Sequence, residues 1–161
     1  MNKSLLVIID FQNAFINQCT IKAKEEIPKL LENKKYDEVL FTRFLNSESN
    51  PVYQKLGWDE CIDMESVKIC IDTAKYDILD KTTYTALNEK MREYIVRKGV
   101  DTVYLCGIDA ECCVLITALN MFENNYNVRV LKDYVYCMYG EKAKKSAIEI
   151  LERNIGRQNV I

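Results

Sequence analysis

The chain has 161 residues and a formal net charge of -2, and 48% of its residues are hydrophobic, which is typical of one globular domain with a buried core. The 22 basic and 24 acidic residues nearly balance, so the charge gives no reason to expect a nucleic-acid or anionic-membrane partner. The chain contains no histidine, which excludes a Ser-His-Asp triad, a Cys-His pair and any His-ligated metal, so acid–base chemistry must come from carboxylates, lysine, tyrosine or cysteine.

Short apolar runs alternate along the chain with helical patterns. Residues 5–9 are apolar at every position, as in a strand that a parallel sheet buries on both faces. Further strands are predicted, in chain order, at residues 39–42, 76–79, 102–106 and 128–131, with a final edge strand at 159–161. Apolar residues at helical spacing predict helices that include residues 27–31 (with Pro28 in the first turn), 87–95 (with Gly99 as C-cap), 115–122 and 143–151. Residues 46–73 are predicted to be irregular, with Asn50-Pro51 and Gly57 as turn signals.

This alternation predicts an α/β protein. We expect a three-layer, Rossmann-like fold with a mostly parallel sheet of five or six strands flanked by helices. No linker or repeat interrupts the pattern, so a single domain over residues 1–161 is predicted. Open sheets of this kind bind ligands outside the carboxyl ends of their strands, so chemistry is expected just after Ile9, Thr42, Leu79, Cys106 and Leu131.

The N-terminal apolar run bears on location. Residues 5–9 are too few to span a bilayer, and no small-residue cleavage site of a signal peptide follows them. We therefore expect a cytoplasmic protein without a membrane partner, whose seven cysteines are thiols and not a disulfide framework. No two cysteines have C-x-x-C spacing, so a structural zinc site is not expected.

Three residues with reactive side chains lie at predicted strand ends. Asp10 follows the first strand, Lys81 follows the third, and Cys113 lies between the fourth strand and the next helix. Each also has a structural interpretation: Asp10 as a helix cap or ion-pair partner, Lys81 as a solvated side chain, and Cys112 and Cys113 as small apolar fillers. Together, however, they supply a base, a cation and a nucleophile. A helix N-terminus lowers thiol pKa values and offers free backbone N–H groups to an oxyanion.

Three segments resemble the motifs of the isochorismatase-like cysteine hydrolases, and the resemblance covers nearly the whole chain. Asp10-Phe-Gln-Asn-Ala-Phe15 resembles the first motif, and Lys81 with Thr82 to Thr85 resembles the lysine segment. Gly107-Ile-Asp-Ala-Glu-Cys-Cys-Val114, followed by Thr117-Ala118, resembles the most specific motif of the family. In that motif the cysteine before valine is the nucleophile, so Cys113 matches and Cys112 does not.

The resemblance implies a mechanism and its residues. It implies a catalytic triad of Asp10, Lys81 and Cys113, a cis peptide bond at Ile108–Asp109, and an oxyanion hole formed by the backbone N–H groups of Asp109 and Cys113. The implied reaction is attack of the thiol on a carbonyl carbon of a small molecule, usually an amide, through a thioester and without a cofactor. Because homo-oligomers are usual in this family, we also expect a homo-oligomer.

One departure from the family concerns a metal. Nicotinamidase-like members bind a divalent metal through a Thr-Arg-Asp-x-His pattern, which aligns with Thr42 to Asn46. Phe44 and Asn46 stand where two of the ligands would be, and the chain has no histidine to compensate. We therefore expect no such metal site, which argues against nicotinamidase activity.

Six residues are candidates for the substrate pocket. The aromatic candidates for its wall are Phe11, Phe15, Trp58 and Tyr84, and the polar candidates are Arg43, which suits a substrate carboxylate, and Asn46. The alternatives are core packing for Phe15, a subunit interface for Trp58, a salt bridge for Arg43 and turn chemistry for Asn46.

Two other functions stay open at this point. A binding or scaffold protein would keep the fold without activity, although the complete set of Asp10, Lys81 and Cys113 argues against it. A thiol redox protein would use Cys112 and Cys113, but adjacent cysteines form only strained disulfides.

Overall fold

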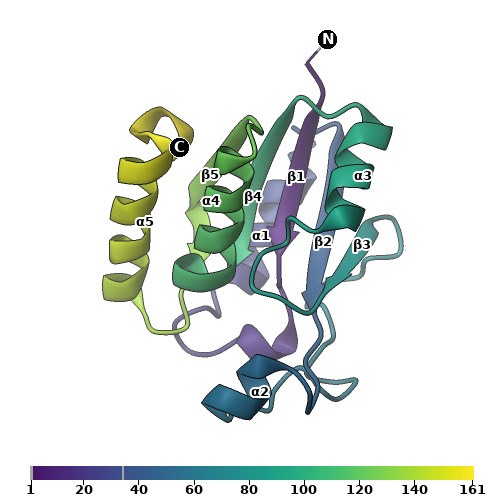
Figure 1. Cartoon of the computed structure of the whole chain (residues 1–161), viewed down its shortest axis with the longest axis vertical. Helices are drawn as coiled ribbons and strands as arrows, with labels where there is room; N and C mark the ends of the chain where they lie inside the picture. Colours follow the sequence, from purple (N-terminus) through teal and green to yellow (C-terminus); the bar gives the residue numbers. More distant parts are fainter. Residues whose placement is uncertain (1, 34) are drawn as a thin grey trace.

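The centre of the molecule is a five-stranded sheet in which every pair of neighbouring strands is parallel (Figure 1). The computed structural model describes residues 2–33 and 35–161. The strands are β1 (Ser4–Ile9), β2 (Glu38–Phe44), β3 (Asp77–Lys81), β4 (Thr102–Ile108) and β5 (Val128–Tyr136), in the order β3-β2-β1-β4-β5. The predicted α/β class and parallel sheet are confirmed.

β1 is the central strand, and its apolar sequence serves both faces of the sheet. Successive side chains of a strand point to opposite faces. Leu5, Val7 and Ile9 accordingly pack into one core, and Leu6 and Ile8 pack into the other. All five side chains are fully buried. A continuous apolar run is therefore what this position in a three-layer fold requires.

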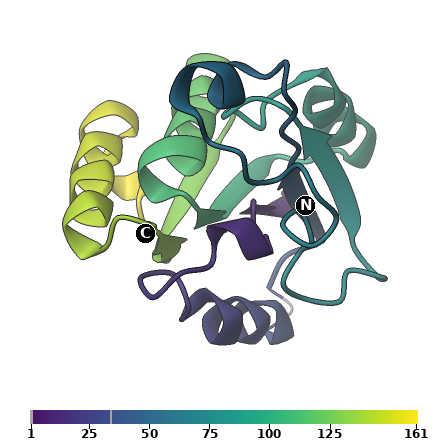
Figure 2. The ribbon, with the colours of Figure 1, turned by 90° about the horizontal axis from the view of Figure 1, so that it is seen from below.

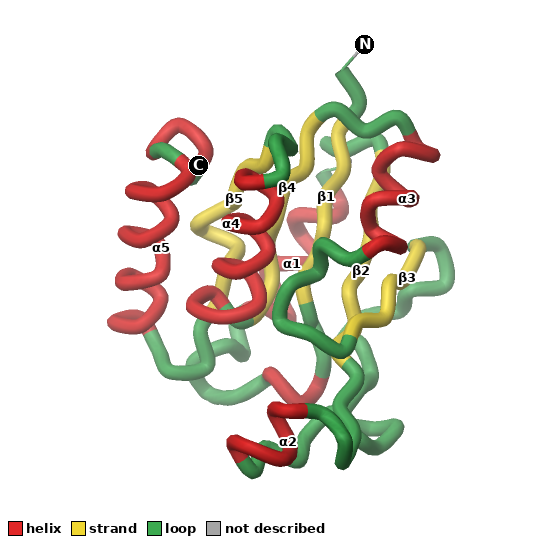
Figure 3. The backbone as a smooth tube through the Cα atoms, in the orientation of Figure 1, coloured by secondary structure: helices red, strands yellow, loops and turns green. Residues whose placement is uncertain are grey.

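Helices cover both faces of the sheet. α3 (Glu89–Lys98), α4 (Leu115–Glu123) and α5 (Glu141–Ile155) lie on one face, and α1 (Ala23–Glu32) lies on the other (Figures 1 and 3). α2 (Pro51–Leu56) lies beyond the carboxyl ends of the strands, the end from which Figure 2 is viewed. Short helical turns at Asn13–Phe15, Ala110–Val114 and Arg157–Asn159 complete the described elements.

The start of α1 and the predicted last strand differ from the sequence prediction. α1 begins at Ala23, so Pro28 lies inside the helix and not in its first turn. Proline has no N–H, so the helix lacks the bond that residue 28 would make to the Lys24 carbonyl. Residues 159–161 do not form a sixth strand; a helical turn ends at Asn159, and Val160 makes a single parallel bridge to Val130.

β5 is longer than its apolar run predicts. The run ends at Leu131, but the strand continues to Tyr136. Between these residues the pairing with β4 shifts register, and Lys132 and Asp133 are exposed. The irregular pairing at this point places polar residues within the strand and interrupts its apolar pattern. The second half of β5 is therefore not recognisable from the sequence.

α2 lies in the stretch that was predicted to be irregular. The Asn50 side chain accepts a hydrogen bond from the Val52 N–H, Pro51 is the first helical residue, and Gly57 ends the helix at φ +67°. The residues read as turn signals are therefore the two caps of a short helix, which is the usual order of proline at the start and glycine after the end. The predicted C-cap Gly99, at φ +65°, is confirmed.

None of the helices in the described part of the chain is long and apolar enough to cross a membrane.

Candidate active site

Three strand ends bring Asp10, Lys81 and Cys113 together. Asp10 follows β1 directly, Lys81 is the last residue of β3, and Cys113 lies in the helical turn between β4 and α4. Lys81 Nζ lies 2.7 Å from Asp10 Oδ2 and 3.5 Å from Cys113 Sγ. The strand order reverses beside β1, which is where open α/β sheets form their ligand crevice.

Asp10 is held by its backbone and by Thr42 of β2. Its φ of +47° is in the left-handed region, which aspartate tolerates better than most residues. The Asp10 N–H donates to Thr42 Oγ1 at 3.1 Å, and the Thr42 hydroxyl donates to Asp10 Oδ1 at 2.7 Å. Oδ2 accepts no aligned hydrogen bond from the described residues, although Lys81 Nζ lies beside it. One carboxylate oxygen is therefore fixed by Thr42, and the other is paired with the Lys81 ammonium.

Lys81 is enclosed rather than solvated. Its side chain is fully buried and donates to the carbonyl oxygens of Thr83 at 2.9 Å and Tyr84 at 3.2 Å. The ammonium also lies 4.9 Å from the centre of the Phe44 ring. Burial acts to lower the pKa of Lys81, but the negative charge of Asp10 and the contact with the Cys113 sulfur outweigh it, so the pKa is raised above its usual value. The site therefore contains a permanent cation.

Cys113 lies in a π-helical turn, Ala110–Val114, that leads directly into α4. The Ile108–Asp109 peptide bond before this turn is cis, as the family resemblance implies. Cys113 is 4% exposed. A hydrogen bond with Cys112, burial and the negative charge of Asp10 raise the pKa of the Cys113 thiol, while Lys81 acts in the opposite direction. The resting residue is therefore a neutral thiol beside a base.

A cavity of about 500 Å³ opens onto Cys113. Its aromatic lining contains the predicted residues Phe15, Trp58 and Tyr84. The Phe15 and Trp58 rings stack with their centres 5.5 Å apart. The rest of the lining comes from the end of β2, from α2, from the turn before α4 and from the segment after β5: Phe44, Val52, Leu56, Asp109, Glu111, Cys112, Met138 and Tyr139. The cavity is thus mostly apolar, with the nucleophile candidate in its wall.

Three predicted pocket residues do not line this cavity. Phe11 is fully buried in the core on the α1 side of the sheet. Arg43 donates to both oxygens of Asp80, at 2.7 and 2.9 Å, so its guanidinium is already paired and is not presented to a substrate. Asn46 donates to the carbonyl oxygens of Trp58 and Glu60, so it holds the backbone of the segment that carries Trp58.

Two supporting residues were missed by the sequence analysis. Thr42 fixes Asp10, as described above. Gln12 is fully buried, donates to the carbonyl oxygens of Phe44 and Val67, and accepts from the Phe44 N–H at 2.7 Å. Gln12 thereby fixes Phe44, whose ring covers Lys81. Thr42 and Gln12 are polar residues at or just after the ends of apolar strands. That placement is the feature of the sequence that could have indicated their supporting role.

The residues at the family's metal position do not fit a metal ion. Phe44 presents an aromatic ring to Lys81 and Trp58. The Asn46 amide nitrogen donates two hydrogen bonds, and its oxygen accepts from the Ser47 N–H. Neither side chain therefore offers a free ligand atom to a metal ion.

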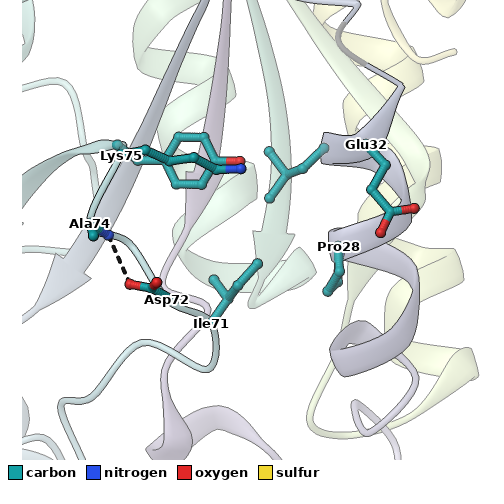
Figure 4. A pocket seen from close by; sticks show the side chains of 8 residues that line it. Pro28, Glu32, Ile71, Asp72, Ala74 and Lys75 are labelled. Carbon is teal, nitrogen blue, oxygen red and sulfur yellow. Dashed lines mark hydrogen bonds between the residues drawn. The ribbon is translucent and has the colours of Figure 1, made fainter.

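A separate cavity of about 490 Å³ lies between α1 and the segment around residues 71–76 (Figure 4). Pro28 and Glu32 line it from α1, and Ile71, Asp72 and Lys75 line it from the segment opposite. Asp10, Lys81 and Cys113 are not among its lining residues, so it is not part of this site.

The fold and the site define a three-layer α/β protein with a cysteine at a strand-to-helix junction. The chain belongs to the isochorismatase family: the model of the isochorismatase domain matches residues 4–157. Isochorismatase family protein 2A of Dictyostelium discoideum is 30% identical over 71 residues, which are 43% of this chain and 36% of that protein. The match therefore spans about a third of that curated relative.

Solved structures show the same fold. An isochorismatase-like hydrolase from Alkaliphilus metalliredigens superposes with a TM-score of 0.86 at 16% identity, covering 98% of this chain and 93% of that one. A nicotinamidase from Bacillus subtilis superposes with a TM-score of 0.83 at 18% identity, covering 96% of this chain and 97% of that one. At these identities the likeness concerns the fold and not the substrate.

Proposed function

We propose that the chain is a cysteine hydrolase that cleaves a small-molecule amide or a related C–N bond through a thioester, with Asp10, Lys81 and Cys113 as the catalytic triad. The observation that carries this proposal is the continuous contact from the Asp10 carboxylate through the Lys81 ammonium to the Cys113 thiol, beside an apolar cavity. The family membership and the fold of the nicotinamidase neighbour support the reaction class.

The reaction begins with loss of the thiol proton. In this proposal the Asp10 carboxylate takes the proton from Cys113 Sγ, because it is the base that Lys81 joins to the sulfur. The Lys81 ammonium, 3.5 Å from the sulfur, stabilises the thiolate that remains. The raised pKa of Cys113 means that the thiol, and not the thiolate, is the form present before the transfer.

The thiolate then forms a bond to the carbonyl carbon of the amide, and the π electrons of the carbonyl move to its oxygen. In this proposal the N–H groups of Asp109 and Cys113 donate to the oxyanion. Within the described part of the chain the Asp109 N–H donates no other hydrogen bond. Collapse breaks the C–N bond, the leaving amine takes the proton from Asp10, and a thioester on Cys113 remains.

Water completes the cycle. Asp10 takes a proton from a water molecule, the hydroxide adds to the thioester carbonyl, and the carbon–sulfur bond breaks. The thiolate recovers the proton from Asp10, so one amide and one water give one acid and one amine. Asp10 thus serves as base and acid in both halves, a task that histidine performs in other cysteine hydrolases.

The proposal is tested by comparing Cys113→Ala with Cys112→Ala in assays of amide hydrolysis. Cys112 is the matched control because it lines the same cavity and adjoins the nucleophile in the chain. We expect Cys113→Ala to lower kcat by at least about 1000-fold with the fold intact, and Cys112→Ala to retain turnover. Equal loss of activity in both variants would contradict the assignment of Cys113 as the sole nucleophile, and full activity of Cys113→Ala would refute the proposal.

A further inference from the structure

The charged residues that line the cavity are all acidic. Asp109 and Glu111 both line it, and among the described residues its lining includes no lysine or arginine. None of the ion pairs in the described part of the chain involves either carboxylate. Two acidic residues therefore line a mostly apolar space, and neither is in an ion pair among the described residues.

The two carboxylates also lie close to each other. Oxygen atoms of Asp109 and Glu111 and the sulfur of Cys137 all lie within 4.8 Å of one another. Asp109 is only 7% exposed. Burial raises the pKa of Asp109 above its usual value, against the hydrogen bonds from Cys137 and the Met138 N–H that lower it. A cation placed beside this pair would relieve both the desolvation and the mutual repulsion.

The basic residues near the site are not available to a substrate anion. Lys81 is fully buried, pairs with Asp10, and donates to Cys113 Sγ and two carbonyl oxygens. Arg43 is held by both oxygens of Asp80. The sequence-based expectation that Arg43 receives a substrate carboxylate therefore has no support in the geometry.

The apolar part of the wall favours the same sign of charge. Phe15, Trp58 and Tyr84 line the cavity. Aromatic faces attract cations and repel anions, and the attraction is strongest where water is excluded. The carboxylates and the rings thus favour a positive ligand together.

We infer that the cavity selects amides that carry a cationic group, such as an amine, amidine or guanidinium, beside an apolar body, with Glu111 as the specificity-determining residue. This inference rests on the proposed hydrolase function and names its substrate class. A substrate carboxylate is excluded, because it would face Asp109 and Glu111 without a free cation.

Trp58 provides the readout, because it is the only tryptophan of the chain and it lines the cavity. Quenching of its fluorescence gives the dissociation constants of three probes of similar size: benzamidine, benzyl alcohol and benzoate. We expect benzamidine to bind at least about tenfold more tightly than benzyl alcohol, and benzoate to bind more weakly than both. Equal affinities, tighter binding of benzoate, or no binding of any probe would overturn the inference.

Glu111→Gln tests the residue, and Glu123→Gln is its matched control because Glu123 is an exposed residue at the end of α4. We expect the ratio of the benzamidine and benzyl alcohol dissociation constants to shrink by about tenfold in Glu111→Gln and to keep its wild-type value in Glu123→Gln. An unchanged ratio in Glu111→Gln would overturn the assignment. Stoichiometric Zn²⁺ binding that Glu111→Gln abolishes, without a preference for benzamidine, would identify a metal site instead.

The two proposals fail separately. A protein that shows the benzamidine preference but never forms an acyl adduct on Cys113 would refute the hydrolase and leave the charge preference standing. A protein that hydrolyses neutral and anionic amides as fast as cationic ones would refute only the charge preference.

Discussion

Lys81 shows what a single residue's surroundings add to its sequence context. A lone lysine after a strand is usually solvated, and nothing in the neighbouring sequence indicates burial. In the folded chain it is fully buried between Asp10 and Cys113, and it also contacts carbonyl oxygens of the segment that follows it. Only the parallel sheet, which brings the ends of β1, β3 and β4 to one edge, explains this environment.

Thr42 is the residue whose removal tests the positioning of Asp10. Thr42→Val removes the hydroxyl that both accepts from the Asp10 N–H and donates to Oδ1, while the side chain keeps its shape. Because the Asp10 carboxylate then loses the hydrogen bond that fixes Oδ1, we expect kcat to fall by about 10- to 100-fold with little change in KM. Steady-state kinetics with an amide substrate would measure both parameters.

Thr42→Ser is the control for this prediction, because it keeps the hydroxyl and removes only a methyl group. We expect Thr42→Ser to recover most of the activity that Thr42→Val loses. Equal losses in the two variants would show that packing of the methyl group matters, and not the hydrogen bonds to Asp10.

The raised pKa of Cys113 predicts the pH dependence of its alkylation. Thiolates and not thiols react with iodoacetamide, and a raised pKa means that a higher pH is needed to form the thiolate. We expect the alkylation rate of Cys113 to stay low near neutral pH and to keep rising above the usual thiol pKa. Peptide mapping after timed alkylation would give the rate, with the exposed Cys19 as internal reference. A rate that reaches its plateau below neutral pH would contradict the assignment of a resting thiol.

The elements were predictable where one local pattern determines them. The apolar run of β1 and the apolar spacing of α3, α4 and α5 indicated the parallel sheet and its helical layers. The pattern failed where another interaction competes with it: the irregular pairing within β5, the caps of α2 that were interpreted as turns, and Pro28 inside α1. These failures moved the ends of β5 and α1 and missed the helix α2, and they left the α/β class of the fold unchanged.

Gly107 is where two elements approach too closely for any side chain. Its φ is +112°, and a Cβ atom there would lie 2.1 Å from the carbonyl oxygen of Ile9. Because β1 and β4 are paired at this point, neither backbone can move aside. We expect Gly107→Ala to lower the free energy of unfolding by about 3 kcal/mol or more, measured by urea denaturation.

Gly57→Ala separates the two causes of that loss. Gly57 also has a positive φ, +67°, but a Cβ atom there has nothing within 4 Å. We expect this control to cost about 1 kcal/mol, from backbone strain alone. If the two variants were equally stable, the close approach of β1 and β4 would not be the limiting feature.

At the scale of the whole molecule, the strand-end rule correctly predicted that Asp10, Lys81 and Cys113 lie at one edge of the sheet, but it did not predict the pocket. Asp10, Lys81 and Cys113 meet because parallel strands all end at one edge. The cavity wall instead depends on α2 and on the segment after β5, including Tyr139. α2 lies in the stretch that was predicted to be irregular, and the segment with Tyr139 follows β5, which is longer than predicted. The sequence therefore indicated the reaction class more directly than the substrate.

The most direct test of the account is mass spectrometry of the intact protein during turnover of an amide substrate. We expect a mass increase equal to the acyl group of the substrate, and peptide mapping that assigns it to Cys113. The mass increase should be absent in Cys113→Ala and present in Cys112→Ala. An acyl group on any other residue, or amide hydrolysis that proceeds equally well in Cys113→Ala, would contradict the thioester mechanism.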